Sequence, residues 1–240
     1  MISRSETSLI RSLSRKKFRD SEGLFVVEGE KLVQEALDSG YEVVKIFRTS
    51  DIGEEAMARI TLLSSPSPVL AVVRQKPRQE PPEPGNDLVL ALDSVRDPGN
   101  MGTIIRIADW FGIKDIAASE DCVEIYNPKV VQATMGAIFR VNVSYCNLEK
   151  YIREVARPSG VPIYGTFLEG DNIYTADLHH SGVIVMGSES NGISSEVEAL
   201  VSSKIHIPSF AGDRATSESL NVAVATAITC SEFRRRGTTL

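Results

Sequence analysis

The residues best suited to chemistry follow an apolar run at residues 88–92. That run predicts a strand buried on both faces, because apolar and polar side chains do not alternate in it. A loop rich in Gly and Asn comes next, and then a helix whose first turns carry Arg106. This is the geometry of an anion or ribose site, because α/β folds bind ligands at the carboxyl ends of strands and helix N-termini favour negative charge. The alternative is that Arg106 pairs with Asp109 on a solvated helix face.

Several other patterns for catalysis or metal binding are absent from the sequence. It has no G-x-x-x-x-G-K-[ST] phosphate loop, no G-x-G-x-x-G dinucleotide pattern and no G-x-S-x-G nucleophile elbow. His179, His180 and His206 have no carboxylate or cysteine at ligand spacing, so we expect no metal site. Asp93 and Asp97 are explained equally well as turn residues.

The composition is that of an ordinary globular protein, with 240 residues, 42% hydrophobic and 24% charged. No apolar run approaches the ~20 residues of a membrane helix, and the first residues lack the apolar core of a signal peptide. The three cysteines, Cys122, Cys146 and Cys230, are too far apart to suggest a disulfide framework. We therefore expect a cytoplasmic protein with no membrane contact.

The net charge of −6 argues mildly against a general nucleic-acid binder, but it hides a local concentration of positive charge. Residues 1–19 hold six basic residues and one acid, and the sequence leaves open a phosphate-binding patch or a solvated terminus there. The candidate RNA-contacting residues are Arg11, Arg15, Lys16, Lys17 and Arg19. For the triplet at 234–236 we favour a solvated terminus.

The chain divides at a proline-rich stretch, QKPRQEPPEPGND, which cannot continue a helix or a central strand. We expect a small α/β domain at 1–76, a linker at 77–87 and a larger domain at 88–240. In the small domain the pattern predicts helices at 8–18 and 31–39 and strands at 24–27, 41–47 and 69–73.

The larger domain alternates strands and helices, which predicts an α/β fold with a mainly parallel sheet and helices on both faces. After the first strand, further strands are expected at 115–118, 139–143, 163–167, 182–186 and 204–207. Helices are expected at 128–136, 148–156, 195–201 and 219–235. The last has Ser219 as its N-cap and lacks a polar face over 222–228, so we expect it to be buried on all sides, by its own sheet or by a second subunit.

Three segments together resemble the SpoU class (TrmH type) of RNA ribose 2′-O-methyltransferases in the SPOUT superfamily. DPGNMGTIIRIADWFGI at 97–113 matches the family's N-x-G-x-x-x-R, and IVMGSESNGIS at 184–194 matches its G-x-E-x-x-G. IPSFAGDRATSESLNVAVATAI at 207–228 matches its Ile-Pro turn and the Ser-Leu-Asn before the last helix. FVVEGEKLVQEAL at 25–37 also looks like the substrate-binding domain of many members.

The resemblance implies S-adenosylmethionine as the methyl donor, a C-terminal trefoil knot and a homodimer formed through the knotted domain. It places the cofactor at Thr166, Gly187, Ile207 and Leu220. It places the reacting end at Asn100, Arg106, Glu189, Ser219 and Asn221. One departure is the stretch at 209–218, which is longer than the shortest family forms and leaves the contacts of that loop open.

The implied reaction moves a methyl group from a sulfonium to a ribose 2′-oxygen. Arg106 suits stabilisation of the developing alkoxide or a clamp on a neighbouring phosphate, because its pKa makes it a poor base. Glu189 would hold Asn100 or the arginine. The expected substrate is structured RNA, either rRNA or tRNA. Two alternatives stay open: an RNA-binding or ribosome-assembly factor without activity, and an enzyme that methylates a base nitrogen.

Overall fold

The computed structural model describes residues 2–211 and 218–237. The contacts divide the chain into two compact units. The first unit is Met1–Pro77 together with Glu124–Arg140, and the second is Arg78–Val123 together with Val141–Leu240. The segment at 124–140, which we expected within the larger domain, therefore groups with the first unit.

The first unit is built on a three-stranded antiparallel sheet in the order β1-β3-β2. The central strand β3 and the edge strand β1 are buried along most of their length, whereas most of β2, the other edge strand, is partly or fully exposed. The elements are α1 (Arg4–Ser12), α2 (Lys16–Glu22), β1 (Leu24–Glu28), α3 (Glu30–Asp38), β2 (Val43–Arg48), α4 (Thr49–Ile52), α5 (Glu54–Ile60) and β3 (Val69–Arg74).

The single helix predicted at 8–18 is wrong, because two helices cover this region. A capping box between Ser3 and Glu6 starts α1 four residues earlier than expected. Leu13, the C-cap of α1, is fully buried, and α2 ends at Gly23 in the left-handed conformation. Helices α4 and α5 were not predicted, because two adjacent short helices give little periodic signal.

The 124–140 segment packs on the sheet of the first unit through α7 (Pro128–Thr134), which contacts β1. The ring of Tyr126 lies 4.6 Å from that of Phe25, and the ring of Phe139 lies 5.0 Å from that of Tyr41. Phe139 ends a short 3-10 turn, Ala137–Phe139, that follows α7. Aromatic contacts therefore join segments about a hundred residues apart in the sequence.

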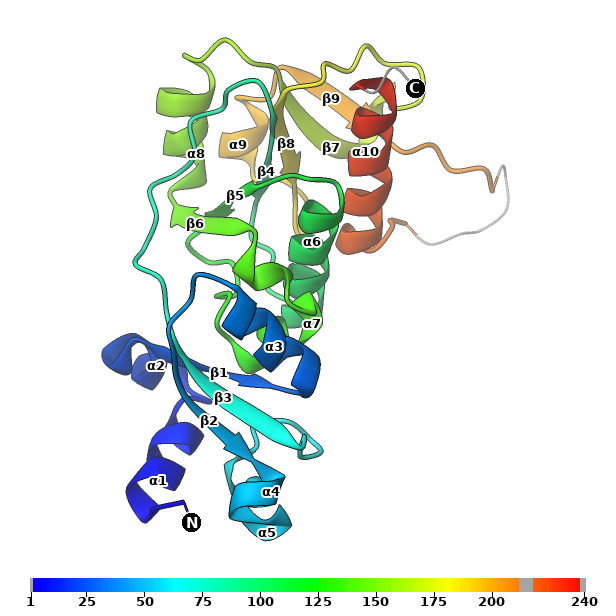
Figure 1. Cartoon of the computed structure of the whole chain (residues 1–240). Coiled ribbons are helices and arrows are strands. Elements are labelled where there is room, and N and C mark those ends of the chain that lie inside the picture. The colour runs from blue at the N-terminus through cyan, green and yellow to red at the C-terminus, as the bar shows by residue number, and fades with distance from the viewer. Residues whose placement is uncertain (1, 212–217, 238–240) are drawn as a thin grey trace. The chain divides into compact units, whose positions relative to one another are not determined.

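The second unit contains a six-stranded sheet in the order β6-β5-β4-β8-β7-β9, and every strand pair is parallel (Figure 1). The predicted parallel sheet is confirmed. Its strands are β4 (Leu88–Leu92), β5 (Asp115–Ser119), β6 (Asn142–Cys146), β7 (Ile163–Asn172), β8 (Gly182–Met186) and β9 (Ser203–His206). The strand expected at 139–143 starts three residues later, because the 3-10 turn occupies its beginning.

Helices cover both faces of this sheet, as predicted. Figure 1 shows α8 and α9 on one face and α6 and α10 on the other. These helices are α6 (Pro98–Trp110), α8 (Leu148–Tyr151), which continues as a π-helix over Ile152–Ala156, α9 (Ser195–Glu198) and α10 (Val222–Gly237). None of the helices in the described ranges is long and apolar enough to cross a membrane.

Helix α10 differs from the prediction in two respects. It begins at Val222 with Asn221 before it, so Ser219 is not its N-cap. It is also not buried on all sides, because the side of Val224 is open and that residue is 49% exposed. The basic triplet at its end is not a solvated terminus either, since all three arginines make ion pairs within the second unit.

Candidate functional site

The candidate site lies where the strand order reverses. From β4 the chain continues to β5 and β6 on one side, while β8, β7 and β9 fill the other side. The carboxyl ends of β4 and β8 therefore flank a topological switch point, the usual ligand position in an open α/β sheet. Asp93 directly follows β4, and Gly187 directly follows β8.

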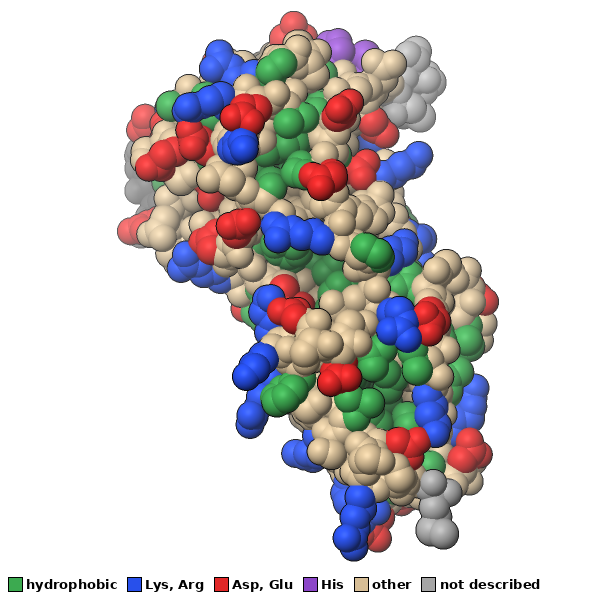
Figure 2. Space-filling view, turned by 90° about the vertical axis from the view of Figure 1, so that its left-hand side faces the viewer, with side chains coloured by type: hydrophobic (Ala, Val, Ile, Leu, Met, Phe, Trp, Pro, Cys, Tyr) green, Lys and Arg blue, Asp and Glu red, His purple; other side chains and the backbone are tan. Residues whose placement is uncertain are grey.

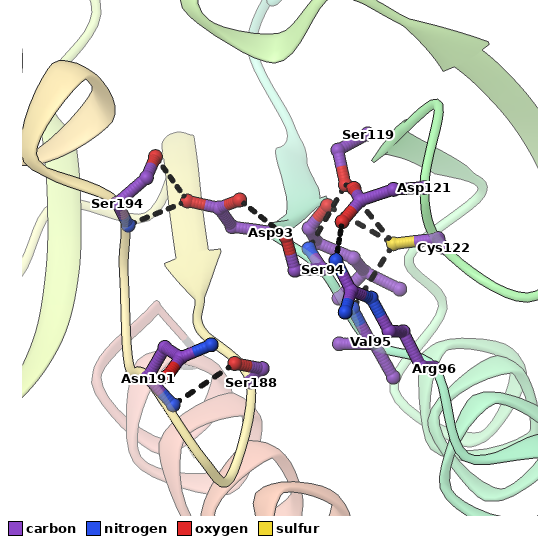
Figure 3. Close-up of polar contacts among 11 residues, drawn as sticks. Asp93, Ser94, Val95, Arg96, Ser119, Asp121, Cys122, Ser188, Asn191 and Ser194 are labelled. Atoms are coloured by element: carbon purple, nitrogen blue, oxygen red, sulfur yellow. Dashed lines mark hydrogen bonds and ion pairs between the residues drawn. The ribbon is translucent and has the colours of Figure 1, made fainter.

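Asp93 fastens these two strand ends together. Its side chain is almost fully buried, and its Oδ2 accepts hydrogen bonds from the backbone amide of Ser194 at 2.8 Å and from the Ser194 hydroxyl at 2.7 Å (Figure 3). A buried carboxylate is stable only when its oxygens are bonded in this way. Asp93 is therefore a structural anchor for the loop after β8, a role that its position in a turn did not reveal.

A second set of bonds ties the loop after β4 to the loop after β5 (Figure 3). The amide of Ser94, which has a φ of 60°, donates to Oγ of Ser119 at 2.9 Å. Ser119 and Arg96 each donate to Asp121 at 2.6 Å. Although burial works in the opposite direction, these bonds lower the pKa of Asp121 to about 2. The loop that leads into α6 is thus held on both sides.

The loop after β8 closes on itself. Ser188 and Gly192 exchange two backbone hydrogen bonds of 3.1 and 2.9 Å. The amide of Asn191 also donates to Oγ of Ser188 at 3.2 Å (Figure 3). A Cβ at Gly187 would lie 2.2 Å from the backbone carbon of Gly192, so only glycine fits there. Gly192 has a φ of +65°. The two glycines of G-x-E-x-x-G therefore make a tight loop that holds Glu189 at its exposed tip.

Three of the predicted reacting residues meet at this edge. Asn100 lies in the first turn of α6, and its side-chain amide donates to the carboxylate of Glu189. Asn221 donates from Nδ2 to Oδ1 of Asn100 at 2.9 Å. Oδ1 of Asn221 accepts from the amides of Ala223 and Val224 at 3.0 and 3.3 Å, so Asn221 is the N-cap of α10. The two helix starts and the glycine loop are therefore joined by side-chain hydrogen bonds.

Arg106 and Ser219 are not part of this network. Arg106 is exposed on α6 and forms no hydrogen bond or ion pair with any residue in the described ranges, Asp109 included. Ser219 is exposed, two residues before Asn221. A cationic side chain that none of the described residues pairs with is available to an external anion.

Two of the predicted cofactor residues, Gly187 and Ile207, directly follow strands, whereas Thr166 lies within a strand. Thr166 lies on β7, and its Oγ1 donates to the carbonyl of Val185 at 3.1 Å, just before Gly187. Ile207 directly follows β9, the other neighbour of β7. Leu220, which precedes α10, is 45% exposed. The carboxyl ends of β8 and β9 thus carry the tightly turned backbone at Gly187 and the partly exposed side chain of Ile207.

The predicted RNA-contacting residues divide into two groups. Arg11, Arg15, Lys16 and Lys17 are exposed. Arg19 is the exception, because it is 2% exposed, donates to the carbonyl of Leu13 at 2.7 Å and pairs with Glu124. It supports the fold of the first unit and is removed from the candidate RNA surface. On the face drawn in Figure 2, basic and acidic side chains alternate and no broad basic field forms.

The chain contains a parallel α/β sheet with this site at its switch point and a separate small α/β unit, and comparison with known families identifies it as an RNA methyltransferase of the SpoU type. The chain belongs to the SpoU rRNA Methylase family, whose sequence model matches residues 87–231. Residues 8–76 match the MRM3-like substrate binding domain.

Relatives of known name are similar to this chain over almost its whole length. The chain is 30% identical to the 23S rRNA (guanosine(2553)-2′-O)-methyltransferase RlmP of Bacillus subtilis, over 91% of each chain. An AdoMet-bound rRNA methyltransferase from Sinorhizobium meliloti has a TM-score of 0.86 and 31% identity, covering 100% of this chain and 98% of the other. A TrmH-family protein from Porphyromonas gingivalis has a TM-score of 0.86 and 38% identity, covering 98% and 99%.

Proposed function

We propose that this protein transfers a methyl group from S-adenosylmethionine to a ribose 2′-hydroxyl of RNA. The observation that carries the proposal is the hydrogen-bonded set of Asn100, Glu189 and Asn221 at the switch point of the sheet. The set brings together one residue from each of the three family segments. Arg106, on the same helix as Asn100, is exposed and has no partner in ranges 2–211 and 218–237, so it can supply the cation that the reaction requires.

Thr166 within β7, the residues that follow β8 and β9, and Leu220 before α10 fit S-adenosylmethionine. The partly exposed side chains of Ile207 and Leu220 offer apolar surface for an adenine ring. The close approach of backbone at Gly187, where a Cβ has no room, leaves main-chain groups to bind the polar parts of the cofactor. Thr166, which contacts Met186, contributes to the same cofactor-binding surface. When bound, the cofactor supplies an activated methyl group on its sulfonium.

The chain's own residues would orient the ribose and stabilise charge. The side chain of Arg106 would bind the phosphate next to the target ribose or stabilise the oxygen as its proton leaves. A guanidinium stays protonated in proteins and does not accept that proton, which passes to phosphate or solvent. Asn100 and Asn221 keep fixed orientations because every amide atom involved has a directed partner. Glu189 holds Asn100, and Ser219 lies next to this group as an exposed hydroxyl.

The RNA is proposed to be ribosomal, since RlmP and the Sinorhizobium protein are rRNA methyltransferases by name. The first unit would hold the body of the RNA, because residues 8–76 match a substrate binding domain. Arg11, Arg15, Lys16 and Lys17 present its exposed cations to phosphates. We propose that residues 1–76, 77–87 and 88–240 act as substrate domain, linker and methyltransferase domain.

A homodimer, a trefoil knot in the methyltransferase domain and a cytoplasmic location complete the proposal. The dimer is supported by the outer face of α6 and α10, where Trp110 is 85% and Val224 is 49% exposed. Such apolar exposure on adjacent helices is typical of an interface. Sedimentation of the purified protein tests the dimer, and a W110E variant that sediments unchanged from the wild type would exclude this face.

Nucleoside mass spectrometry of rRNA and tRNA from cells with and without the gene tests the activity. We expect one 2′-O-methylnucleoside to disappear from rRNA in the absence of the gene. Loss from tRNA would change the substrate, and loss of a base-methylated nucleoside would change the reaction. If no modification changes, and purified protein transfers no labelled methyl group to RNA, an assembly factor replaces the enzyme.

A further inference from the structure

Helices α6 and α10 lie side by side and are joined at both ends (Figure 1). At their first residues Asn221 bonds Asn100 at 2.9 Å. At their last residues Arg234 of α10 donates from Nε to the carbonyl of Phe111, the C-cap of α6, at 2.8 Å. Because start meets start and end meets end, the two helices run parallel.

The contact made by Arg234 suits the end of a helix. The last carbonyls of an α-helix lack intrahelical partners and carry partial negative charge, so a guanidinium is a favourable cap. Arg234 binds the carbonyl of the C-cap, and its Nη2 also lies 3.3 Å from the carbonyl of Gly112, one residue beyond the cap. The same nitrogen lies 2.8 Å from Oδ1 of Asp87.

Asp87 fixes this arginine to the sheet. Its Oδ1 also accepts from the amide of Leu88, the first residue of β4, at 2.8 Å. Its carbonyl accepts from the amide of Gly182, the first residue of β8, at 3.2 Å. Arg234 thus connects the end of α6, the end of α10 and the amino-terminal edge of the two strands that flank the site.

We propose that Arg234 is a positioning residue for methyl transfer, acting at the far end of α6 from the reacting groups. A slip of α6 along α10 by one residue moves its side chains by about 1.5 Å and turns them by about 100°. Such a slip would separate Asn100 from Asn221 and redirect Arg106. Arg234 sets the axial position that makes the 2.9 Å bond between the two asparagines. This inference rests on the proposed methyltransferase function.

The neighbouring arginine provides a matched control. Arg235 is in the same last turn of α10, but its one ion pair with a described residue is with Glu232 of its own helix, at 2.7 Å. Its loss removes an arginine and an ion pair without freeing the end of α6. R235Q is therefore expected to keep the activity of the wild type.

The test compares R234Q, R234K, D87N and R235Q in the full-length protein, well below the melting temperature of each variant. Labelled methyl transfer to RNA gives kcat and KM, and calorimetry gives the dissociation constant for S-adenosylmethionine. For R234Q we expect kcat to fall by about 10-fold or more, since ångström-scale misplacement of reacting groups costs up to about 10²-fold. Cofactor affinity should change less than twofold. D87N keeps an oxygen that can accept from the amide of Leu88, so its kcat should fall less than that of R234Q. The kcat of R234K should lie between those of R234Q and the wild type.

The double variant N221A/R234Q separates positioning from a general loss of stability. If Arg234 acts through the contact between Asn221 and Asn100, R234Q costs little once Asn221 is gone, so the combined loss is well below the product of the single losses. A combined loss equal to that product, or a kcat of R234Q equal to that of R235Q, would overturn the proposal. A wild type that transfers no methyl group overturns the proposed function instead.

Discussion

Asn221 donates its side-chain amide to Oδ1 of Asn100 across 121 positions of sequence, at 2.9 Å. The direction of this bond is fixed, because Oδ1 of Asn221 is already occupied by the amides of Ala223 and Val224. Asn100 must then present its own Nδ2 to Glu189. One line of hydrogen bonds therefore runs from the start of α10 to the carboxylate, with the anion at the accepting end.

Replacement of Asn221 by Asp separates its two roles. The carboxylate in N221D still caps α10, and its charge favours the helix N-terminus, so we expect the melting temperature to stay within a few degrees of the wild type. It cannot donate to Asn100, so kcat should fall by about 10-fold or more. N221A should lose both the rate and about 1 kcal/mol of stability. Thermal unfolding beside methyl-transfer assays measures both effects, and an N221D protein with full activity would remove this residue from the site.

Loss of Arg106 is expected to stop the reaction without weakening the binding of the cofactor. The side chain makes no polar contact with a described residue, so R106A should keep its fold. A charge that stabilises the reacting oxygen is worth about 10²–10³ in kcat, which is the loss we expect. Arg153, an exposed arginine that pairs with Glu149 on the opposite face of the sheet, serves as the control in R153A. An equal loss of S-adenosylmethionine affinity in R106A would contradict this division of roles.

Alanine at the two glycines of the loop after β8 should have unequal effects. At Gly187 the added Cβ would meet backbone at 2.2 Å, so G187A should cost about 3 kcal/mol or more and open the loop. At Gly192 no atom lies within 4 Å, and only the φ of +65° opposes a side chain, which costs about 1 kcal/mol. Denaturant unfolding of both variants measures the difference, and equal losses would mean that the loop is looser than its contacts indicate.

The basic residues of the first unit should separate into structural and RNA-binding groups. R19M leaves Glu124 without its cation in a partly buried position, where burial already raises the pKa of this carboxyl, so a loss of about 3–5 kcal/mol is expected. R15M removes an exposed charge and should leave stability unchanged. It should weaken RNA binding and lower the slope of log affinity against log salt by about 1. Filter binding at several salt concentrations and thermal unfolding distinguish the two outcomes.

Ion pairs at the end of α10 should make the free energy of unfolding depend on pH in the acidic range. Hydrogen bonds from Arg235 and then Arg236 lower the pKa of Glu232 from its ordinary 4.5 to about 2. A group with a lowered pKa contributes stability above its unfolded value and loses it as the pH falls through the folded value. We therefore expect the contribution of Glu232 to be complete above pH 4.5 and to decline between pH 4.5 and 2. The stability difference between the wild type and E232Q, measured by urea unfolding, should shrink over that range.

The elements that the sequence predicted well were those with a strong local signal. The runs that form β4 and β8 are apolar throughout, and both strands have the predicted bounds. The glycines at 187 and 192 were expected only through the family's G-x-E-x-x-G, and the structure gives each a backbone reason: a Cβ clash at Gly187 and a φ of +65° at Gly192. The remaining site residues were predicted from the family resemblance. The contacts between Asn100, Glu189 and Asn221 agree with its placement of these three residues together.

What could not be predicted depends on partners distant in sequence. Arg19 belongs to a basic cluster by composition, and only the position of Glu124 shows that it is buried. Asp93 has the same local signal as any turn aspartate, although Ser194 makes it an anchor. Arg234 looks like part of a solvated tail until the end of α6 is placed beside it. No periodicity or propensity contains this information, because it arises from tertiary contacts.

The membership of 124–140 in the first unit has a consequence for synthesis on the ribosome. The chain leaves the first unit after Pro77, returns at Glu124 and leaves again after Arg140. Domains usually fold in order as they emerge, amino-terminal first. Here the first unit cannot complete its packing until Arg140 has left the exit tunnel, by which time β4, α6 and β5 have already been made. The two units must therefore mature together, and a stall between residues 77 and 124 would leave an unfinished substrate domain for chaperones to hold.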